Sequence, residues 1–413
     1  MKIAFFSDCY LDLTGGIVTC INAEKAELEK LGHTVYVFSS AFPCSNSNKL
    51  KLAKDHIFPV PSCKFFGKGL TPIARRPKIV EKYILKNFPE IKDFDIFYIH
   101  YEAGCSIAGL RLAKNLKISS IQVMHGREDI SIDSLVPFGL RTVAATLLNW
   151  SHSWYLPHKV KVKKDHYLAD TISRAKMWTL MINHANYADM VFTPSEHFLK
   201  KLQHYGLTKP AVAIHHGVSN SLINKNITPK SFSADETLNI IWHSRVAGGK
   251  NIMLFLEALN ILQNQHQKTN YHFYVYGSGN ELGKAKRYVK KHQLKVTFYG
   301  DSKFDKIWQQ IQKSHLDVLV SYNFDTFGMT LIEAQAAGVP NFIIDPDMKE
   351  ILPPESYIIA KEPTSKQMAS ALINIFDHPE IINRMSKKAI AAIDEIDVSH
   401  KIQKVEKIMK TLP

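Results

Sequence analysis

Two carboxylates follow what reads as a buried strand in residues 321–345, SYNFDTFGMTLIEAQAAGVPNFIID. The run LDVLVSY predicts a strand, MTLIEAQAA a helix ended by Gly338, and PNFIID the next strand. Together they make a βαβ unit, with Asp325 in its loop and Glu333 on its helix. The loop and first helical turn present backbone N–H groups that suit a phosphate, at Phe327, Gly328, Met329 and Thr330.

A carboxylate pointed at that phosphate would repel it, so Asp325 and Glu333 are expected to bind uncharged groups. Sugar hydroxyls fit this requirement, because a carboxylate accepts hydrogen bonds from two neighbouring hydroxyls. The alternative is structural, with Asp325 capping the helix and Glu333 lying in solvent.

Two cations and two glycine turns also follow expected strands. Arg245 and Lys250, in WHSRVAGGKNI, flank a Gly-Gly turn and are placed to hold a diphosphate. Gly16, after the first strand, and Gly277, in VYGSGNE, let a backbone approach a phosphate. The first turn is not G-x-G-x-x-G, which disfavours a nicotinamide cofactor, and the cation loop is not a Walker loop. Taken singly, these features are also explained by tight turns and surface charges.

His125 ends the strand run SIQVMH, on the side of the first half where ligands bind in such folds. A histidine there can hydrogen-bond a sugar hydroxyl or a reacting oxygen. The alternative is an ordinary loop histidine, since the chain holds 19 of them.

Strand and helix patterns alternate along the chain, which predicts an α/β protein of doubly wound parallel sheets with helices on both faces. We expect a first domain at residues 1–219 and a second at 237–395. The polar, aperiodic residues 220–236 are interpreted as the linker, and 396–413 as a helix that returns to the first domain. A central cleft between the domains is expected to hold the ligands.

The 413 residues carry a net charge of +14, with 28 Lys and Arg against 18 Asp and Glu in residues 1–215. This excess favours an anionic surface nearby, either a membrane or a nucleic acid, but no nucleic-acid recognition motif is present. No run of about 18 apolar residues predicts a membrane span, and the start does not read as a signal peptide. The five cysteines form no C-x-x-C pair, which favours reduced thiols in the cytosol.

The least regular segment, residues 125–188, places aromatic side chains ahead of four lysines. Trp150, Trp154 and Tyr155 precede Lys159, Lys161, Lys163 and Lys164. Aromatic side chains beside lysines suit a membrane interface. The alternative is a solvated helix pair that covers the sheet edge.

The order of these motifs resembles the GT-B retaining glycosyltransferases of family 4 over nearly the whole chain. DTFGMTLIEAQAAGVP is similar to the E-x7-E signature of that family with its E-A-x-A-x-G-x-P continuation, SRVAGGK to its phosphate clamp, and IHHGV to its N-G-V motif. The first half most resembles bacterial 1,2-diacylglycerol 3-alpha-glucosyltransferases, through FFSDCYLDLTGGIVTCI, FFGKGLTPIARRPKIVEKYI and DIFYIHYEAGCSIAGLRLAKNL. One residue departs from the signature: its first Glu is Asp325 here, one methylene shorter.

The resemblance implies two Rossmann-like domains and the retaining transfer of a hexose, with glucose from UDP-glucose as the expected donor. It implies that Arg245 and Lys250 neutralise the diphosphate, that Glu333 holds the ribose and Asp325 the hexose, and that His125 contacts the 6-hydroxyl of the sugar. The remaining donor-binding positions are Gly16, Gly277, Phe327, Gly328, Met329 and Thr330. No metal and no cofactor are expected beside the nucleotide sugar.

The acceptor implied by the resemblance is a lipid such as diacylglycerol, used by a peripheral enzyme on the inner face of the plasma membrane. An anionic membrane surface is then the expected partner, and nucleic acid is not. A soluble, protein or cell-wall polymer acceptor stays open, as does a non-catalytic partner subunit of a protein glycosyltransferase.

Overall fold

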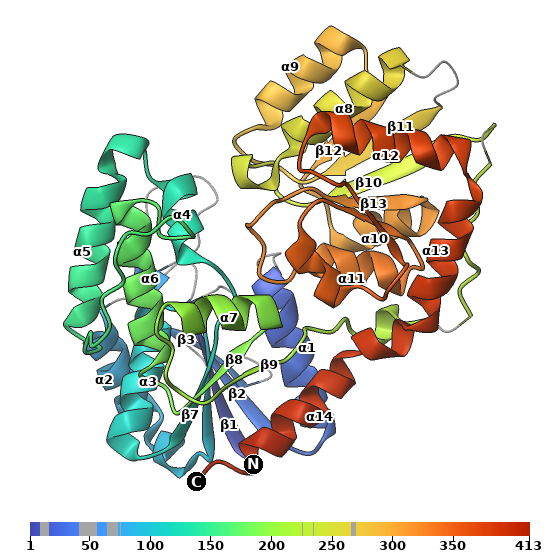
Figure 1. Ribbon diagram of the computed structural model, residues 1–413. Coiled ribbons are helices and arrows are strands. Elements are labelled where there is room, and N and C mark those ends of the chain that lie inside the picture. Colours follow the sequence, from blue (N-terminus) through green and yellow to red (C-terminus); the bar gives the residue numbers. More distant parts are fainter. Residues whose placement is uncertain are drawn as a thin grey trace. The chain divides into compact units, whose positions relative to one another are not determined.

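The computed structural model describes residues 1–8, 16–40, 56–63, 73–74, 76–224, 226–233, 235–265 and 270–413. The chain divides into two compact units, residues 1–216 with 398–413 and residues 217–397 (Figure 1). Each unit has a parallel sheet with helices packed on it, which confirms the predicted α/β class with two doubly wound domains. In the part that the structure describes, no helix is long and apolar enough to cross a membrane.

The first unit is built on a parallel sheet whose described strands follow the order β3-β2-β1-β6-β7-β8-β9. Its central strands are buried along their length, which explains why they read as apolar runs rather than as alternating patterns. The strands are β1 (Lys2–Ser7), β2 (Thr34–Ser40), β3 (Ile57–Val60), β6 (Ile96–His100), β7 (Ser119–Val123), β8 (Met190–Thr193) and β9 (Ala211–Ala213). A short antiparallel pair is formed by β4 (Ser62–Cys63) and β5 (Ile73–Ala74).

The helices of the first unit include one from the end of the chain. They are α1 (Gly16–Lys30), α2 (Pro77–Asn87), α3 (Gly104–Leu116), α4 (Glu128–Leu135), α5 (Arg141–Ser153), α6 (Ile172–Ala185), α7 (Glu196–His204) and α14 (Val398–Met409). Val398, Ile402, Val405 and Met409 are buried and recur at helical spacing, so α14 packs one apolar side into the core of this unit. It lies beside α1, where Lys401 forms an ion pair with Glu24 (Figure 1).

The second unit has a parallel sheet with the order β12-β11-β10-β13-β14-β15 among its described strands. Its core includes Trp242, Phe255 and Phe273, all fully buried. The strands are β10 (Leu238–His243), β11 (Tyr271–Tyr276), β12 (Val296–Gly300), β13 (Leu316–Leu319), β14 (Asn341–Ile343) and β15 (Tyr357–Ile359). The helices are α8 (Ile252–Gln265), α9 (Leu282–His292), α10 (Phe304–Lys313), α11 (Met329–Ala336), α12 (Ser365–Asp377) and α13 (Glu380–Ala391).

The segment that we interpreted as the linker, residues 220–236, is largely part of the second unit. Phe232 is buried in the core of that unit, although the sequence around it is polar. The Lys230 backbone N–H donates to the Ser386 hydroxyl at 2.8 Å, and the Asn383 amide donates to the Lys230 carbonyl at 3.2 Å. These polar residues are therefore fastened by backbone hydrogen bonds, which a composition pattern does not reveal.

Two of the stretches that carry the family resemblance fall partly outside the described residues. The residues of these stretches that lie outside the described part are 9–15, which include Gly15, and 65–72 with 75. Gly16 is described and is the first residue of α1.

Candidate functional site

The carboxyl ends of β10 and β11 bring two loops into contact in the second unit. The register pairs His243 with Tyr276, so the loops that follow these strands leave the sheet side by side. A Cβ added to Gly277, where φ is +123°, would lie 2.2 Å from the Ser244 carbonyl oxygen. The same atom on Gly279 would lie 2.2 Å from the Val246 carbonyl oxygen. Gly277 is therefore required for loop packing, which is a structural reason for it besides the predicted contact with the donor.

Lys250 and Asp325, which are 75 residues apart in the sequence, form an ion pair at this edge. Lys250 ends the short 3-10 turn η5 (Gly248–Lys250), and its Nζ lies 2.6 Å from Asp325 Oδ1. The Ser321 hydroxyl donates to the other oxygen, Asp325 Oδ2. Both charged side chains are mostly buried, so the pair is a fixed part of the site.

The ring of Phe324 positions this pair. It lies 5.3 Å from Lys250 Nζ, in cation–π range. A Cβ added to Gly249 would lie only 2.0 Å from this ring. The Gly-Gly turn therefore exists because an aromatic ring from the β13–α11 loop packs on its backbone.

Arg245 differs from Lys250 in being exposed. Among the described residues, no hydrogen bond or ion pair holds its side chain. A guanidinium that is unpaired and follows a strand end can bind a diphosphate without first losing a protein partner.

Helix α11 starts immediately after the Asp325 loop. Its N-cap residue is Gly328, with φ of +78°, so Asp325 does not stand at the N-cap position. The first turn carries no carboxylate, and Phe327 before it is buried. The Thr330 hydroxyl is buried without a hydrogen-bond partner among the described residues. These features keep the start of α11, at Met329 and Thr330, compatible with an anion.

Glu333 is not in solvent, because it contacts a histidine that the sequence analysis did not consider. His243 Nδ1 lies 3.3 Å from Glu333 Oε2, and His243 Nε2 lies 3.2 Å from Asp317 Oδ1. Burial by itself lowers the pKa of His243, but the carboxylates of Asp317 and Glu333 outweigh burial and raise this pKa to about 10. His243 is therefore a cation that holds Glu333 in place. The sequence contains one indication of this contact, because Asp317 is a carboxylate inside an otherwise apolar strand run.

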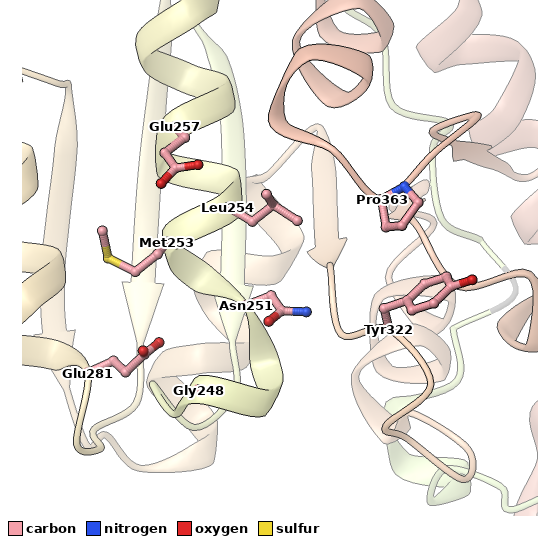
Figure 2. A pocket seen from close by; sticks show the side chains of 8 residues that line it. All are labelled: Gly248, Asn251, Met253, Leu254, Glu257, Glu281, Tyr322 and Pro363. Atoms are coloured by element: carbon pink, nitrogen blue, oxygen red, sulfur yellow. The ribbon is translucent and has the colours of Figure 1, made fainter. Parts of the chain in front are cut away.

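An open cavity of about 420 Å³ adjoins η5. Figure 2 shows Asn251, Met253, Leu254 and Glu257 at the start of α8, with Glu281 and Tyr322 on neighbouring loops. Two carboxylates, Glu257 and Glu281, line this cavity and no cation does. Its charge disfavours a diphosphate, so the cavity is a neighbour of the candidate site and not the phosphate subsite.

In the first unit, His125 lies just beyond the end of β7 and is 8% exposed. Its Nε2 is 2.9 Å from Nδ1 of His100, the last residue of β6, and its ring stacks on His216, which follows β9. Burial lowers the pKa of His125 well below its usual value, and His100 lowers it further, so the ring is neutral near pH 7. His100 and His216 were missed, although three strand runs of this half end in histidine.

Helix α14 completes this histidine cluster. Lys401 Nζ lies 2.8 Å from His216 Nδ1 and also forms an ion pair with Glu24 of α1. Both side chains of the ion pair are almost fully buried. The end of the chain therefore helps to orient the neutral rings around His125.

Three carboxylates lie near the same edge of the first unit: Asp8 and Glu102 are buried, and Glu128 is half-buried. Asp8 caps α3 by accepting from the backbone N–H groups of Cys105 and Ser106. Burial, then Asp129 and Asp8, raises the pKa of Glu128 to about 7, and burial with Glu128 raises that of Glu102 well above its usual value. These groups hold protons at higher pH than ordinary carboxyls, and the sequence analysis did not single them out.

The four lysines expected at a membrane lie in the first unit, on a segment between α5 and α6 that is neither helix nor strand. All four are exposed: Lys159, Lys161, Lys163 and Lys164. Among the described residues, no group of three or more His, Cys, Asp or Glu side chains is arranged to hold a metal ion.

Comparison with known proteins places this geometry in a family. Residues 14–222 match the family model described as Glycosyltransferase Family 4, and residues 224–392 match that of Glycosyl transferases group 1. The chain is 24% identical to the alpha-monoglucosyldiacylglycerol synthase of Acholeplasma laidlawii over 394 residues, which is 94% of this chain and 92% of that protein.

Solved structures show the same fold. HepE from Anabaena, in complex with UDP-glucose, aligns over 100% of both chains with a TM-score of 0.66 and 15% identity. Sucrose-phosphate synthase from Thermosynechococcus elongatus aligns over 99% of this chain and 98% of its own, with a TM-score of 0.66 and 13% identity. The fold is therefore GT-B, and the chain belongs to family 4 of the glycosyltransferases.

Proposed function

We propose that this glycosyltransferase moves glucose from UDP-glucose to a membrane lipid such as diacylglycerol, with retention at the anomeric carbon. The observation that carries the proposal is the edge of the second unit, where the Lys250–Asp325 pair lies in the same strand-end loops as the unpaired Arg245. Cations there suit a diphosphate and carboxylates suit sugar hydroxyls. The named relative from Acholeplasma laidlawii supports the lipid acceptor, and HepE supports UDP-glucose as the donor.

In the proposed reaction, the negative charge that develops on the leaving diphosphate contributes most to the activation free energy. Arg245, Lys250 and the backbone at the start of α11 neutralise that charge as the bond between the anomeric carbon and the phosphate oxygen breaks. Each preorganised donor of this kind contributes about 10²–10³ in rate. The acceptor hydroxyl attacks from the face that UDP leaves, and its proton passes to the departing phosphate oxygen. No metal takes part in this proposal.

The remaining site residues orient the donor. Glu333, held by the His243 cation, accepts hydrogen bonds from the ribose hydroxyls. Asp325, which is held by Lys250 and Ser321, accepts a hydrogen bond from the hexose. His125, kept neutral by burial, offers a ring nitrogen to the sugar 6-hydroxyl.

Thermal unfolding in the presence of UDP, GDP, ADP or CMP tests the donor. A ligand at about 100 times its dissociation constant adds about 2.7 kcal/mol to the stability of the folded state. Because the second unit is the size of an ordinary single domain of about 150–250 residues, this added stability raises its Tm by roughly 5–10 °C. A rise with UDP alone supports the proposal, whereas no rise with any nucleotide favours a non-catalytic partner subunit.

Transfer tests the acceptor and the stereochemistry. The purified chain with UDP-glucose and diacylglycerol should form a monoglucosyl lipid whose anomeric proton has the α-coupling in NMR. Transfer to a soluble glycan or protein instead of the lipid would refute the acceptor, and a β-linked product would refute retention.

A further inference from the structure

Helix α5 exposes an apolar side. Fourteen large apolar side chains are exposed among the described residues, and seven of them lie within residues 138–154. Five of the seven, three within α5 and one at each of its caps, are separated by three or four positions and so share one side of the helix. We call these five residues the α5 stripe: Leu140, Val143, Leu147, Trp150 and Trp154.

The opposite side of α5 holds the helix in the fold. Ala145 and His152 are buried, and the Asn149 amide donates to the Lys176 carbonyl of α6 at 2.5 Å. Figure 1 shows α5 and α6 side by side. By contrast, every residue of the α5 stripe is between 55% and 58% exposed. The stripe therefore contributes little to folding.

Residues 159–164, which we call the lysine segment, are attached to the same helix α6. The Lys159 and Val160 backbone N–H groups donate to the Asn183 side chain at 2.7 and 3.0 Å, and that of Val162 donates to Thr179 at 2.9 Å. Val160 and Val162 are partly buried and pack against the core of this unit, whereas the four lysines are exposed.

The charge around the α5 stripe favours one kind of partner. Residues 134–164 contain five basic residues and no Asp or Glu. A second copy of this chain seated on the stripe would bring two such regions together and be repelled. An anionic lipid surface attracts the lysines and accepts the apolar side chains. The Trp150 and Trp154 rings, whose centroids are 4.3 Å apart, have the amphipathic character found at membrane interfaces.

We propose that α5 lies in the plane of an anionic bilayer, with the α5 stripe inserted at the headgroup–acyl boundary and the lysine segment on the headgroups. This inference rests on the proposed lipid acceptor and deepens it, because it names the element that takes the enzyme to its acceptor. It extends the membrane face expected from the sequence, which consisted of Trp150, Trp154, Tyr155 and the four lysines, to Leu140, Val143 and Leu147.

Vesicle co-sedimentation tests the insertion, using phosphatidylcholine with or without phosphatidylglycerol. The variant carrying Leu147→Gln, Trp150→Gln and Trp154→Gln should partition on the order of 100-fold less than the unmodified chain at both low and high salt. Leu31→Gln, an exposed leucine of the same unit, is the matched control for Leu147→Gln and should bind normally. Replacing the four lysines with Ser should weaken binding about fivefold per lysine, at low salt only.

Tryptophan fluorescence localises the contact. Phosphatidylglycerol vesicles should shift the emission of the unmodified chain to the blue, and lipids brominated near the headgroup should quench it. The Trp150→Gln, Trp154→Gln variant should lose most of both effects. Equal binding by the triple variant and the unmodified chain would overturn the proposal. Light scattering that finds a dimer of the unmodified chain and a monomer of the triple variant would also overturn it, because the stripe would then be an interface between copies.

A soluble acceptor separates this inference from the proposed function. With UDP-glucose and a short-chain diacylglycerol kept below its micelle concentration, the triple variant should transfer glucose as fast as the unmodified chain. If the triple variant binds vesicles normally and the unmodified chain transfers glucose, the insertion is refuted and the proposed function is supported. If the triple variant loses vesicle binding but no form of the enzyme transfers glucose, the insertion is supported and the proposed acceptor is refuted.

Discussion

Replacing His243 with Gln should remove a pH-dependent part of the stability of the second unit. The side chain is 2% exposed and lies between Asp317 and Glu333, at 3.2 and 3.3 Å. Burial lowers its pKa, but the two carboxylates raise it to about 10. Burial also raises the pKa of Asp317, and the His243 cation opposes that rise, so the cation compensates buried negative charge.

The magnitude follows from proton linkage. A shift from about 6.5 to about 10 corresponds to about 5 kcal/mol, at about 1.4 kcal/mol per pKa unit. Because the folded pKa lies above the unfolded one, this contribution is complete below pH 6.5 and is lost as pH rises through about 10. Roughly 3 kcal/mol remains at pH 7.5 and roughly 1.4 kcal/mol at pH 9.

Thermal unfolding at pH 7.5 and pH 9 measures the effect, and hydrogen exchange of β10 and β13 assigns it to the second unit. The variant should lose roughly 6–12 °C at pH 7.5 and clearly less at pH 9. His272→Gln is the control, because burial lowers the pKa of His272 and that ring is neutral at both pH values. A deficit of the His243 variant that does not shrink between pH 7.5 and pH 9 would refute the cation assignment.

Three further predictions concern the two units separately. Lys250→Ala should lower kcat with UDP-glucose by about 10²–10³ while circular dichroism shows a folded chain, and unchanged turnover would refute the diphosphate role. Gly249→Ala should lower both Tm and UDP affinity, because its Cβ would lie 2.0 Å from the Phe324 ring, and Phe324→Ala in the same chain should restore Tm. Acidification from pH 7 to pH 5 should destabilise the first unit of the unmodified chain more than that of a His100→Gln variant, because burial lowers the pKa of His100 well below the unfolded value of about 6.5. The comparison cancels the opposite contribution of Glu102 and Glu128, whose raised pKa values favour the folded state at lower pH. Hydrogen exchange of β6 and β7 with the same pH dependence in both chains would contradict the neutral ring.

Much of the fold could be predicted because it depends on local patterns. Apolar runs of four to seven residues gave the central strands of both sheets, and amphipathic runs such as that of α8 gave the helices that cover them. Parallel strands in a doubly wound sheet end at one edge, so residues that follow strands could be assigned to a shared edge before their contacts were known. Arg245, Lys250, Gly277 and Asp325 are such residues.

Other features depend on which strands become neighbours, and no local pattern encodes that. His243 meets Asp317, 74 positions further on, because β10 pairs with β13, and Glu333 then reaches the same ring from α11. The role of residues 220–236 was obscured for a similar reason, since their partners lie about 150 residues further on.

The sequence by itself therefore determined the α/β class, the doubly wound sheets and the strand ends at which the chemistry is placed, because periodicity and turn residues act over a few positions. The tertiary structure alone decided the charge state and orientation of the site groups. It buried the His100, His125 and His216 rings and so kept them neutral, it made His243 a cation, and it left the α5 stripe uncovered. Burial and long-range pairing are properties of the packed chain, and an apolar helical pattern reads the same whether its partner is a protein core or a lipid surface.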